Sequence, residues 1–164
     1  MSENSNINQK SIEFIFKRIN FRIERYPRMV LFDKPCDSYT LQNNSIILGE
    51  EEHPLYEERA VNSYVLITNL YLYSNIYKHI QNSDSPLGEF RIAIKDVKYF
   101  KYPSEILDEK ESRSDYTEYV LSYIYSKDEE QKVPVRVGVN HEFFFMETLR
   151  QLVCMYNTQT KIIN

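Results

Sequence analysis

The stretch Ser63–Tyr77, SYVLITNLYLYSNIY, decides the fold. Large apolar and aromatic side chains alternate at period two on both sides of Asn69, and such alternation is typical of β-strands. Asparagine tolerates a positive φ angle, so Asn69 suits a tight reversal. We therefore expect a β-hairpin centred near Thr68-Asn69. Its large side chains need a second layer to cover them, and the rest of the chain has to supply that layer.

Length and composition exclude several classes of protein. A chain of 164 residues with 42% hydrophobic and 14% aromatic residues predicts one domain with a real core. Three glycines leave almost no room for a glycine-rich phosphate loop. A net charge of −4 opposes general affinity for nucleic acids and anionic membranes. Cys36 and Cys154 are expected to be reduced thiols of a cytoplasmic protein, since the sequence shows no signal peptide.

The N-terminal segment 1–28 is expected to hold a tail and an amphipathic helix, ahead of a domain over 29–164. Apolar residues at helical spacing run from Ile12 to Tyr26, Pro27 ends the pattern, and the other face is basic. Such a helix either docks on its own domain or lies on a membrane. A strand over Ile19–Ile23 is the competing local interpretation.

Further strands are predicted before and after the hairpin. The segments with strand character are Met29–Phe32, Ser45–Gly49, one or two strands within Phe90–Tyr102, Tyr116–Tyr125 and Val133–Val139. Pro134 cannot donate a ladder hydrogen bond and indicates a strand start or an edge. A helix follows from an Asn140 N-cap to about Tyr156, with Asn157 as a stop and with Leu149 and Leu152 on its buried stripe.

Two acidic segments are expected to be solvated loops. Gly49–Arg59 contains five glutamates and Pro54, and Pro103–Asp115 is polar and mostly acidic. Like charges at this density repel one another and stay in water. Because each loop leads into a strand, we expect the two to form or flank the working surface.

The order of these segments resembles PH-like domains, and the bacterial PH and GRAM-type domains in particular. The resemblance rests on VLITNLYLYS, FRIAIKDVKYFKY, YVLSYIYS and VPVRVGVN, followed by HEFFFMETLRQLV, and covers roughly Ser45–Asn157. It implies a mostly β, α+β fold: an antiparallel barrel or sandwich capped by a C-terminal helix, here with an extra N-terminal helix. The tryptophan of many PH helices is absent, and Gly49–Arg59 is acidic where lipid-binding members are basic. The implied fold therefore carries over without the lipid site.

No residue pattern indicates catalysis, a metal or a cofactor. His53 follows three glutamates without a second histidine at ligand spacing, so a surface charge run is the better interpretation. His141 and Glu142 are adjacent on a helix and point apart, which makes them a poor catalytic pair. Cys154, beside the apolar face of the C-terminal helix, is expected to be a buried structural thiol. We expect a protein that is not an enzyme.

Three functional hypotheses follow, and the first is preferred. It is a non-catalytic protein-binding module, in its most concrete form an immunity-type protein that neutralises a basic partner. The alternatives are a peripheral lipid-binding domain that uses the basic N-terminal helix, and an enzyme with an unrecognised site. The preferred hypothesis assigns partner binding to the acidic loops and their neighbouring aromatic anchors: Glu50, Glu51, Glu52, Tyr56, Glu57, Glu58, Asp108, Glu109, Glu111, Asp115 and Tyr116.

Overall fold

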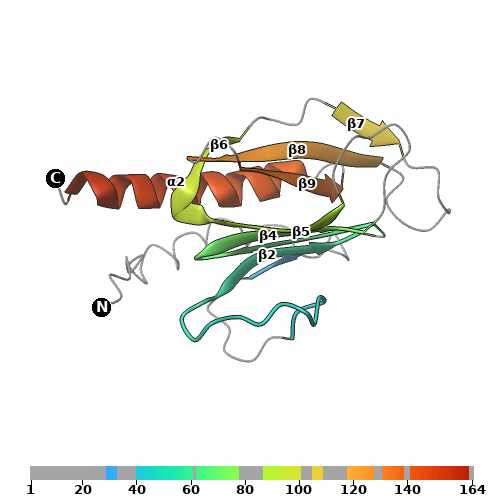
Figure 1. Cartoon of the computed structure of the whole chain (residues 1–164), viewed down its shortest axis with the longest axis horizontal. Helices are drawn as coiled ribbons and strands as arrows, with labels where there is room; N and C mark the ends of the chain where they lie inside the picture. The colour runs from blue at the N-terminus through green and yellow to red at the C-terminus, as the bar shows by residue number, and fades with distance from the viewer. Residues whose placement is uncertain are drawn as a thin grey trace.

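The computed structural model describes residues 29–32, 40–60, 62–77, 87–100, 105–108, 118–127, 131–138 and 141–162. Within these ranges the chain forms two antiparallel sheets and a long C-terminal helix (Figure 1). The elements in chain order are β1 Met29–Leu31, β2 Pro54–Arg59, β3 Ser63–Thr68, β4 Tyr71–Ile76, β5 Gly88–Ala93, the 3-10 helix η2 Ile94–Asp96, β6 Val97–Phe100, β7 Glu105–Asp108, β8 Glu118–Ser126, β9 Lys132–Gly138 and α2 Glu142–Ile162.

The first sheet has the strand order β1-β2-β3-β4-β5 and contains the predicted hairpin. Strands β3 and β4 pair with Ile67 opposite Leu72, and the chain reverses at Asn69-Leu70. In the turn, the Thr68 hydroxyl oxygen accepts hydrogen bonds from the backbone N–H groups of Leu70 at 3.2 Å and Tyr71 at 2.9 Å. The expected hairpin centred near Thr68-Asn69 is therefore confirmed.

The second sheet is organised around β8. Strand β9 follows one edge of β8 from Tyr119 to Tyr125, whereas β6 pairs with residues 124–126 and β7 with residues 118–121. Because a strand has only two edges, β6 and β7 must share the other edge and lie end to end along it. Pro134 lies in β9, which pairs with β8 alone among the described strands, as expected for a residue without a backbone donor.

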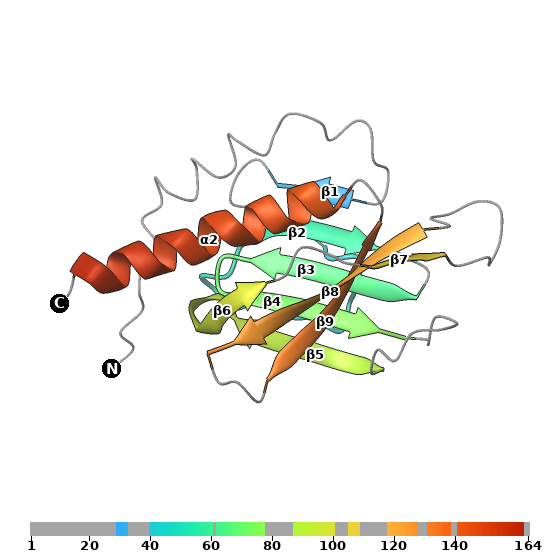
Figure 2. The same cartoon turned by 90° about the horizontal axis from the view of Figure 1, so that it is seen from above.

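The two sheets face each other as a sandwich, and β8 and β9 cross the first sheet diagonally (Figure 2). No backbone ladder joins the sheets in the described ranges, so the mostly β architecture is confirmed and closure into a barrel is not. The Ser74 hydroxyl of β4 donates to the Pro134 carbonyl of β9 at 2.6 Å, a hydrogen bond that connects the two sheets where they cross. The predicted helix within 1–28 lies outside the described residues.

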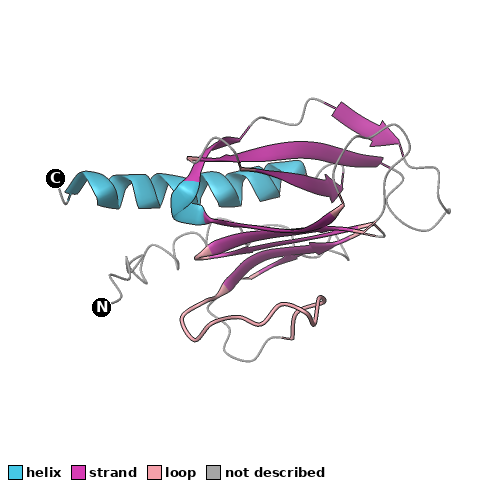
Figure 3. Cartoon of the chain, in the orientation of Figure 1, coloured by secondary structure: helices cyan, strands magenta, loops and turns pink. Residues whose placement is uncertain are grey.

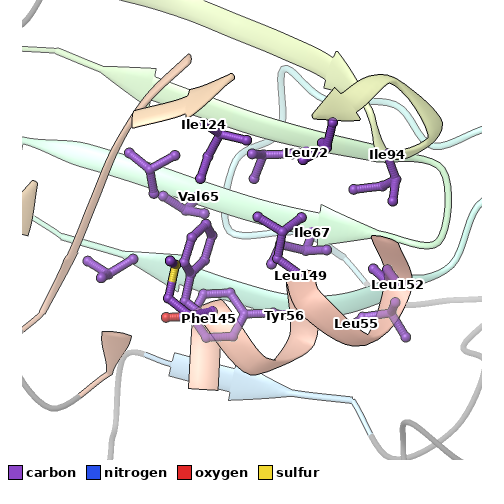
Figure 4. Packing of buried hydrophobic residues seen from close by; sticks show 14 of the residues in the cluster. Leu55, Tyr56, Val65, Ile67, Leu72, Ile94, Ile124, Phe145, Leu149 and Leu152 are labelled. Carbon is purple, nitrogen blue, oxygen red and sulfur yellow. The ribbon is translucent and has the colours of Figure 1, made fainter. Parts of the chain in front are cut away.

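Helix α2 lies at the opening between the sheets and contributes one wall of the core (Figure 4). Its apolar stripe, including Phe145, Leu149 and Leu152, packs against Val65 and Ile67 of the first sheet. Leu149 and Leu152 are fully buried, as the helical periodicity predicted. Each fully buried leucine contributes about 1.5–3 kcal/mol, so closure by the helix is a major part of the stability.

Four boundaries differ from the sequence expectation. Residues 45–49 form a loop rather than a strand, because Ile46 and Leu48 pack back onto the first sheet. The expected loop Gly49–Arg59 contains β2, and the expected loop Pro103–Asp115 contains β7. Helix α2 continues past Asn157 to Ile162, since a single asparagine penalises a helix only slightly. The predicted N-cap, Asn140, lies outside the described residues.

Candidate functional site

The structure divides the first acidic segment into exposed and buried residues. Glu50 and Glu51 are exposed in the loop that precedes β2. Tyr56, Glu57 and Glu58 belong to β2 and are almost completely buried, and Glu52 is 7% exposed. The prediction that the whole segment is a solvated loop is therefore wrong, and the burial of Tyr56, Glu57 and Glu58 removes them from any surface that a partner contacts.

Glu58 is the centre of a buried polar cluster between β2 and the start of α2. Its Oε1 atom lies 2.9 Å from His141 Nδ1 and accepts the Gly138 N–H at 2.9 Å, while the Tyr56 hydroxyl donates to Oε2. Glu58 and His141 are each 1% exposed. A carboxylate beside an imidazole could carry acid–base chemistry, but a substrate has no access here. The cluster instead joins the first sheet to the C-terminal part of the chain.

Glu52 and Glu57 hold the loop of residues 40–53 on the outer face of the first sheet, the face turned away from the second sheet (Figure 3). Glu57 accepts the Gln42 N–H at 2.6 Å and the Tyr64 hydroxyl at 2.9 Å. Glu52 accepts the hydroxyls of Thr68 and Tyr73, both at 2.8 Å. The loop is thus attached by buried charge-assisted hydrogen bonds, which are stronger than neutral ones.

Apolar contacts and a bracing side chain fix the same loop. Leu41 packs on Tyr64 and Leu66 of β3, and Ile46 and Leu48 lie against this small outer cluster. Asn69 supports the end of the loop, because its side chain accepts the His53 N–H at 2.7 Å and donates to the Glu51 carbonyl at 3.0 Å. The loop therefore presents its exposed residues from a defined position.

The second acidic segment is described only in part. Asp108 is the last residue of β7, where its backbone pairs with Glu118 of β8. Glu109, Glu111, Asp115 and Tyr116 lie outside the described residues. Whether the two acidic segments meet at one end of the molecule therefore stays a prediction.

The part of the outer face over β4 and β5 is rich in aromatic side chains. The rings of Tyr71 and Tyr73 lie 5.9 Å apart, and the Arg91 guanidinium stands 4.9 Å above the Tyr71 ring. Tyr77 follows β4 and is 51% exposed, and Leu87 precedes β5 and is 46% exposed. Tyrosine and arginine dominate the energetics of protein interfaces, so this face has a suitable composition for one.

Two hollows lined by described residues adjoin this face, and Ile46 and Ile47 line both of them. One, of about 720 Å³, lies within the 40–53 loop and includes Glu50, Glu52 and His53 in its lining. The other, of about 390 Å³, lies between Ser45–Ile47 and the strands β4 and β5. Ile47 is 88% exposed, which is extreme for a large aliphatic side chain. The two isoleucines thus form a ridge with a depression on either side.

Tyr73 stays neutral in this setting. Burial raises the pKa of its hydroxyl well above the usual value, and the hydrogen bond to the nearby Glu52 carboxylate raises it further. The Arg91 guanidinium acts in the opposite direction without cancelling these effects. Tyr73 therefore acts as a hydrogen-bond donor and not as a phenolate.

The remaining candidate residues do not form a chemical site. Cys154 is exposed rather than buried, and Cys36 lies outside the described residues. Among the described side chains, no group of three or more His, Cys, Asp or Glu is placed to hold a metal ion. No helix within the described ranges has both the length and the apolar character to cross a bilayer. Sequence reasoning missed the Glu58–His141 pair because 83 residues separate its members.

Comparison with known proteins supplies one likeness. The fold is similar to the crystal structure of a PH-domain-containing bacterial protein from Exiguobacterium sibiricum, with a TM-score of 0.37 and 13% sequence identity. The match covers 67% of this chain and 52% of that protein's chain. The matched protein contains a PH domain, and PH-like domains are the class that this sequence resembles. No protein-family model matches the sequence, and no curated protein matches it either.

Proposed function

We propose that this chain is a non-catalytic protein-binding module, and that it contacts its partner through the outer face of the first sheet. The contact surface consists of four exposed or half-buried apolar and aromatic residues with two carboxylates at the rim: Ile47, Tyr73, Tyr77, Leu87, Glu50 and Glu51. The observation that supports it best is Ile47, an aliphatic side chain 88% exposed on a firmly attached loop.

The continuity of the surface distinguishes it from scattered exposed side chains, which need no explanation. Ile47, Tyr73 and Glu89 line the same groove. Tyr77 contacts the loop, because its hydroxyl lies 3.5 Å from Asn43 Nδ2. Ile76 of β4 pairs with Gly88 of β5. Tyr77, which follows Ile76, and Leu87, which precedes Gly88, therefore lie beside each other. The apolar residues thus extend from the loop across the ends of β4 and β5.

The charge of the rim favours a basic partner. Glu50 and Glu51 are exposed, and the whole chain carries a net charge of −4. Such charge speeds the encounter with a basic protein and is screened within about 10 Å at 0.1 M salt. Neutralisation of a basic toxin, the immunity-type role, is the version of this function that the charge supports.

The test is a partner isolated from the native host, identified by mass spectrometry and purified. We expect Ile47→Asp to weaken its binding at least about 30-fold, which corresponds to the ~2 kcal/mol of an interface hot spot. Phe143→Asp is the matched control, because Phe143 is 62% exposed but lies on α2. Glu50→Gln with Glu51→Gln should slow association at low salt. If Phe143→Asp weakens binding and Ile47→Asp does not, the proposed surface is wrong.

A further inference from the structure

The groove beside Ile47 contains a polar group without a partner. Asn75 lies in β4, between Tyr64 of β3 and Glu89 of β5, and is 3% exposed. Its side chain lines the groove, and its Nδ2 atom is buried with no hydrogen-bond partner in the described part of the chain. Buried amide groups are nearly always paired, and an unpaired one destabilises a fold. Such a group is therefore a reason to look for a missing partner.

The chemistry of the carboxamide restricts what this partner is. A carboxamide carries a donor and an acceptor side by side, which is the complement of a backbone peptide group. A half-turn about the terminal bond exchanges the two ends, so Asn75 is able to present either one to the groove. A peptide main chain, with its alternating N–H and C=O groups, satisfies such a side chain in both directions.

The other groove residues suit the same occupant. Ile46 and Ile47 supply apolar contact, while Glu89 and Arg91 supply one acceptor and one donor group of opposite charge. Because the lining carries one carboxylate and one guanidinium, it gives no net preference for a phosphate or another strongly charged group. The volume of about 390 Å³ lies within the range of about 300–1,000 Å³ typical of ligand clefts.

We infer that this groove binds an extended peptide segment of the protein partner, and that Asn75 pairs with one of its backbone amide groups. The inference rests on the proposed function and adds the form in which the partner is recognised. The segment lies along β4 and β5, its side chains contact the Ile46–Ile47 ridge and Tyr77, and its main chain supplies the partner that Asn75 lacks.

A physical signature separates this role from a structural one. If Asn75 serves binding, Asn75→Leu removes an unpaired buried amide and should leave the melting temperature unchanged or raised, while peptide binding falls. A structural asparagine would behave in the opposite way, with lower stability and no specific loss of binding. Asn75→Ser, which adds no apolar bulk, gives the same test if leucine overfills the site.

The probe is a phage-displayed library of random dodecapeptides, selected on the wild-type protein. An enriched peptide carrying a fluorophore is then titrated by fluorescence polarisation. We expect Asn75→Leu and Ile47→Asp each to weaken binding at least tenfold, and Asn157→Leu, at an exposed asparagine of α2, to leave it unchanged.

The outcomes separate this inference from the proposed function. Equal affinity for wild type and Asn75→Leu overturns the role of Asn75, and no enriched peptide overturns recognition of an extended segment. In both cases the proposed surface still stands if the natural partner loses affinity for Ile47→Asp. If Ile47→Asp has no effect on the natural partner either, the proposed function fails as well.

Discussion

Replacement of Glu58 by alanine tests the buried cluster that joins the first sheet to the C-terminal part of the chain. The Glu58 carboxylate accepts hydrogen bonds from Tyr56, Gly138 and His141. The side chains of Glu58 and His141 are both buried. Alanine removes the acceptor of these three buried hydrogen bonds, and the loss of each costs about 1–3 kcal/mol.

We therefore expect Glu58→Ala to lower the free energy of unfolding by about 3–5 kcal/mol. For a domain of this size that corresponds to a loss of ~6–20 °C in melting temperature. Urea denaturation followed by circular dichroism measures the first quantity, and a thermal scan measures the second. Glu58→Gln is the informative companion, because it keeps an acceptor oxygen for Gly138 and His141 and should cost less than alanine.

Two controls define what would refute this reasoning. Glu50→Ala removes an exposed carboxylate of the same chain and should change the stability by less than ~0.5 kcal/mol. If Glu58→Ala is as mild as Glu50→Ala, the carboxylate does not accept these hydrogen bonds in solution. If Glu58→Gln is as severe as Glu58→Ala, the negative charge rather than the acceptor geometry carries the stabilisation.

Two further results are expected from the core and the outer face. Leu149→Ala should lower the free energy of unfolding, measured by urea denaturation, by about 2–5 kcal/mol, because this side chain is fully buried. A variant with wild-type stability would place the helix outside the core. Tyr73→Phe should reduce the loss of stability at alkaline pH. Because the pKa of Tyr73 is raised in the folded state, its contribution to stability is fully present below the unfolded-state pKa of about 10. That contribution is lost as the pH rises toward the folded-state pKa. Parallel pH profiles of wild type and Tyr73→Phe would contradict this.

The strands with regular alternation could be predicted from sequence, and the reasons are local. In Ser63–Ile76 the large apolar side chains of Val65, Ile67 and Leu72 share the core face at period two, so periodicity alone predicts the hairpin. The same holds for the apolar stripe of α2. Strand β7 was missed because Ile106 and Leu107 are a short apolar pair among acidic residues, and a strand of four residues has too few positions to show a period.

The errors in the candidate site have a different cause. Glu57 and Glu58 are charged residues within a strand, and their burial depends in part on Gln42, 15 residues away, and on His141, 83 residues away. No local pattern contains that information. In residues 45–49 the alternation of Ile46, Ile47 and Leu48 is real, but it comes from a loop that lies on a sheet and turns one face inward. Period two shows that a segment is half-buried and does not show that it pairs as a strand.

The position of Glu58 also sets an order on folding during synthesis. The first sheet, from β1 to β5, is complete in sequence by Ala93, yet two acceptor contacts of Glu58 come from Gly138 and His141. Until those residues leave the ribosome, Glu58 lacks these two donors, and the apolar inner face of the first sheet lacks its cover by α2. We therefore expect that a nascent chain that ends near Ala93 does not fold on its own. We expect native structure to form late, once the C-terminal helix is available, and chains truncated before it to be substrates for chaperones and proteases.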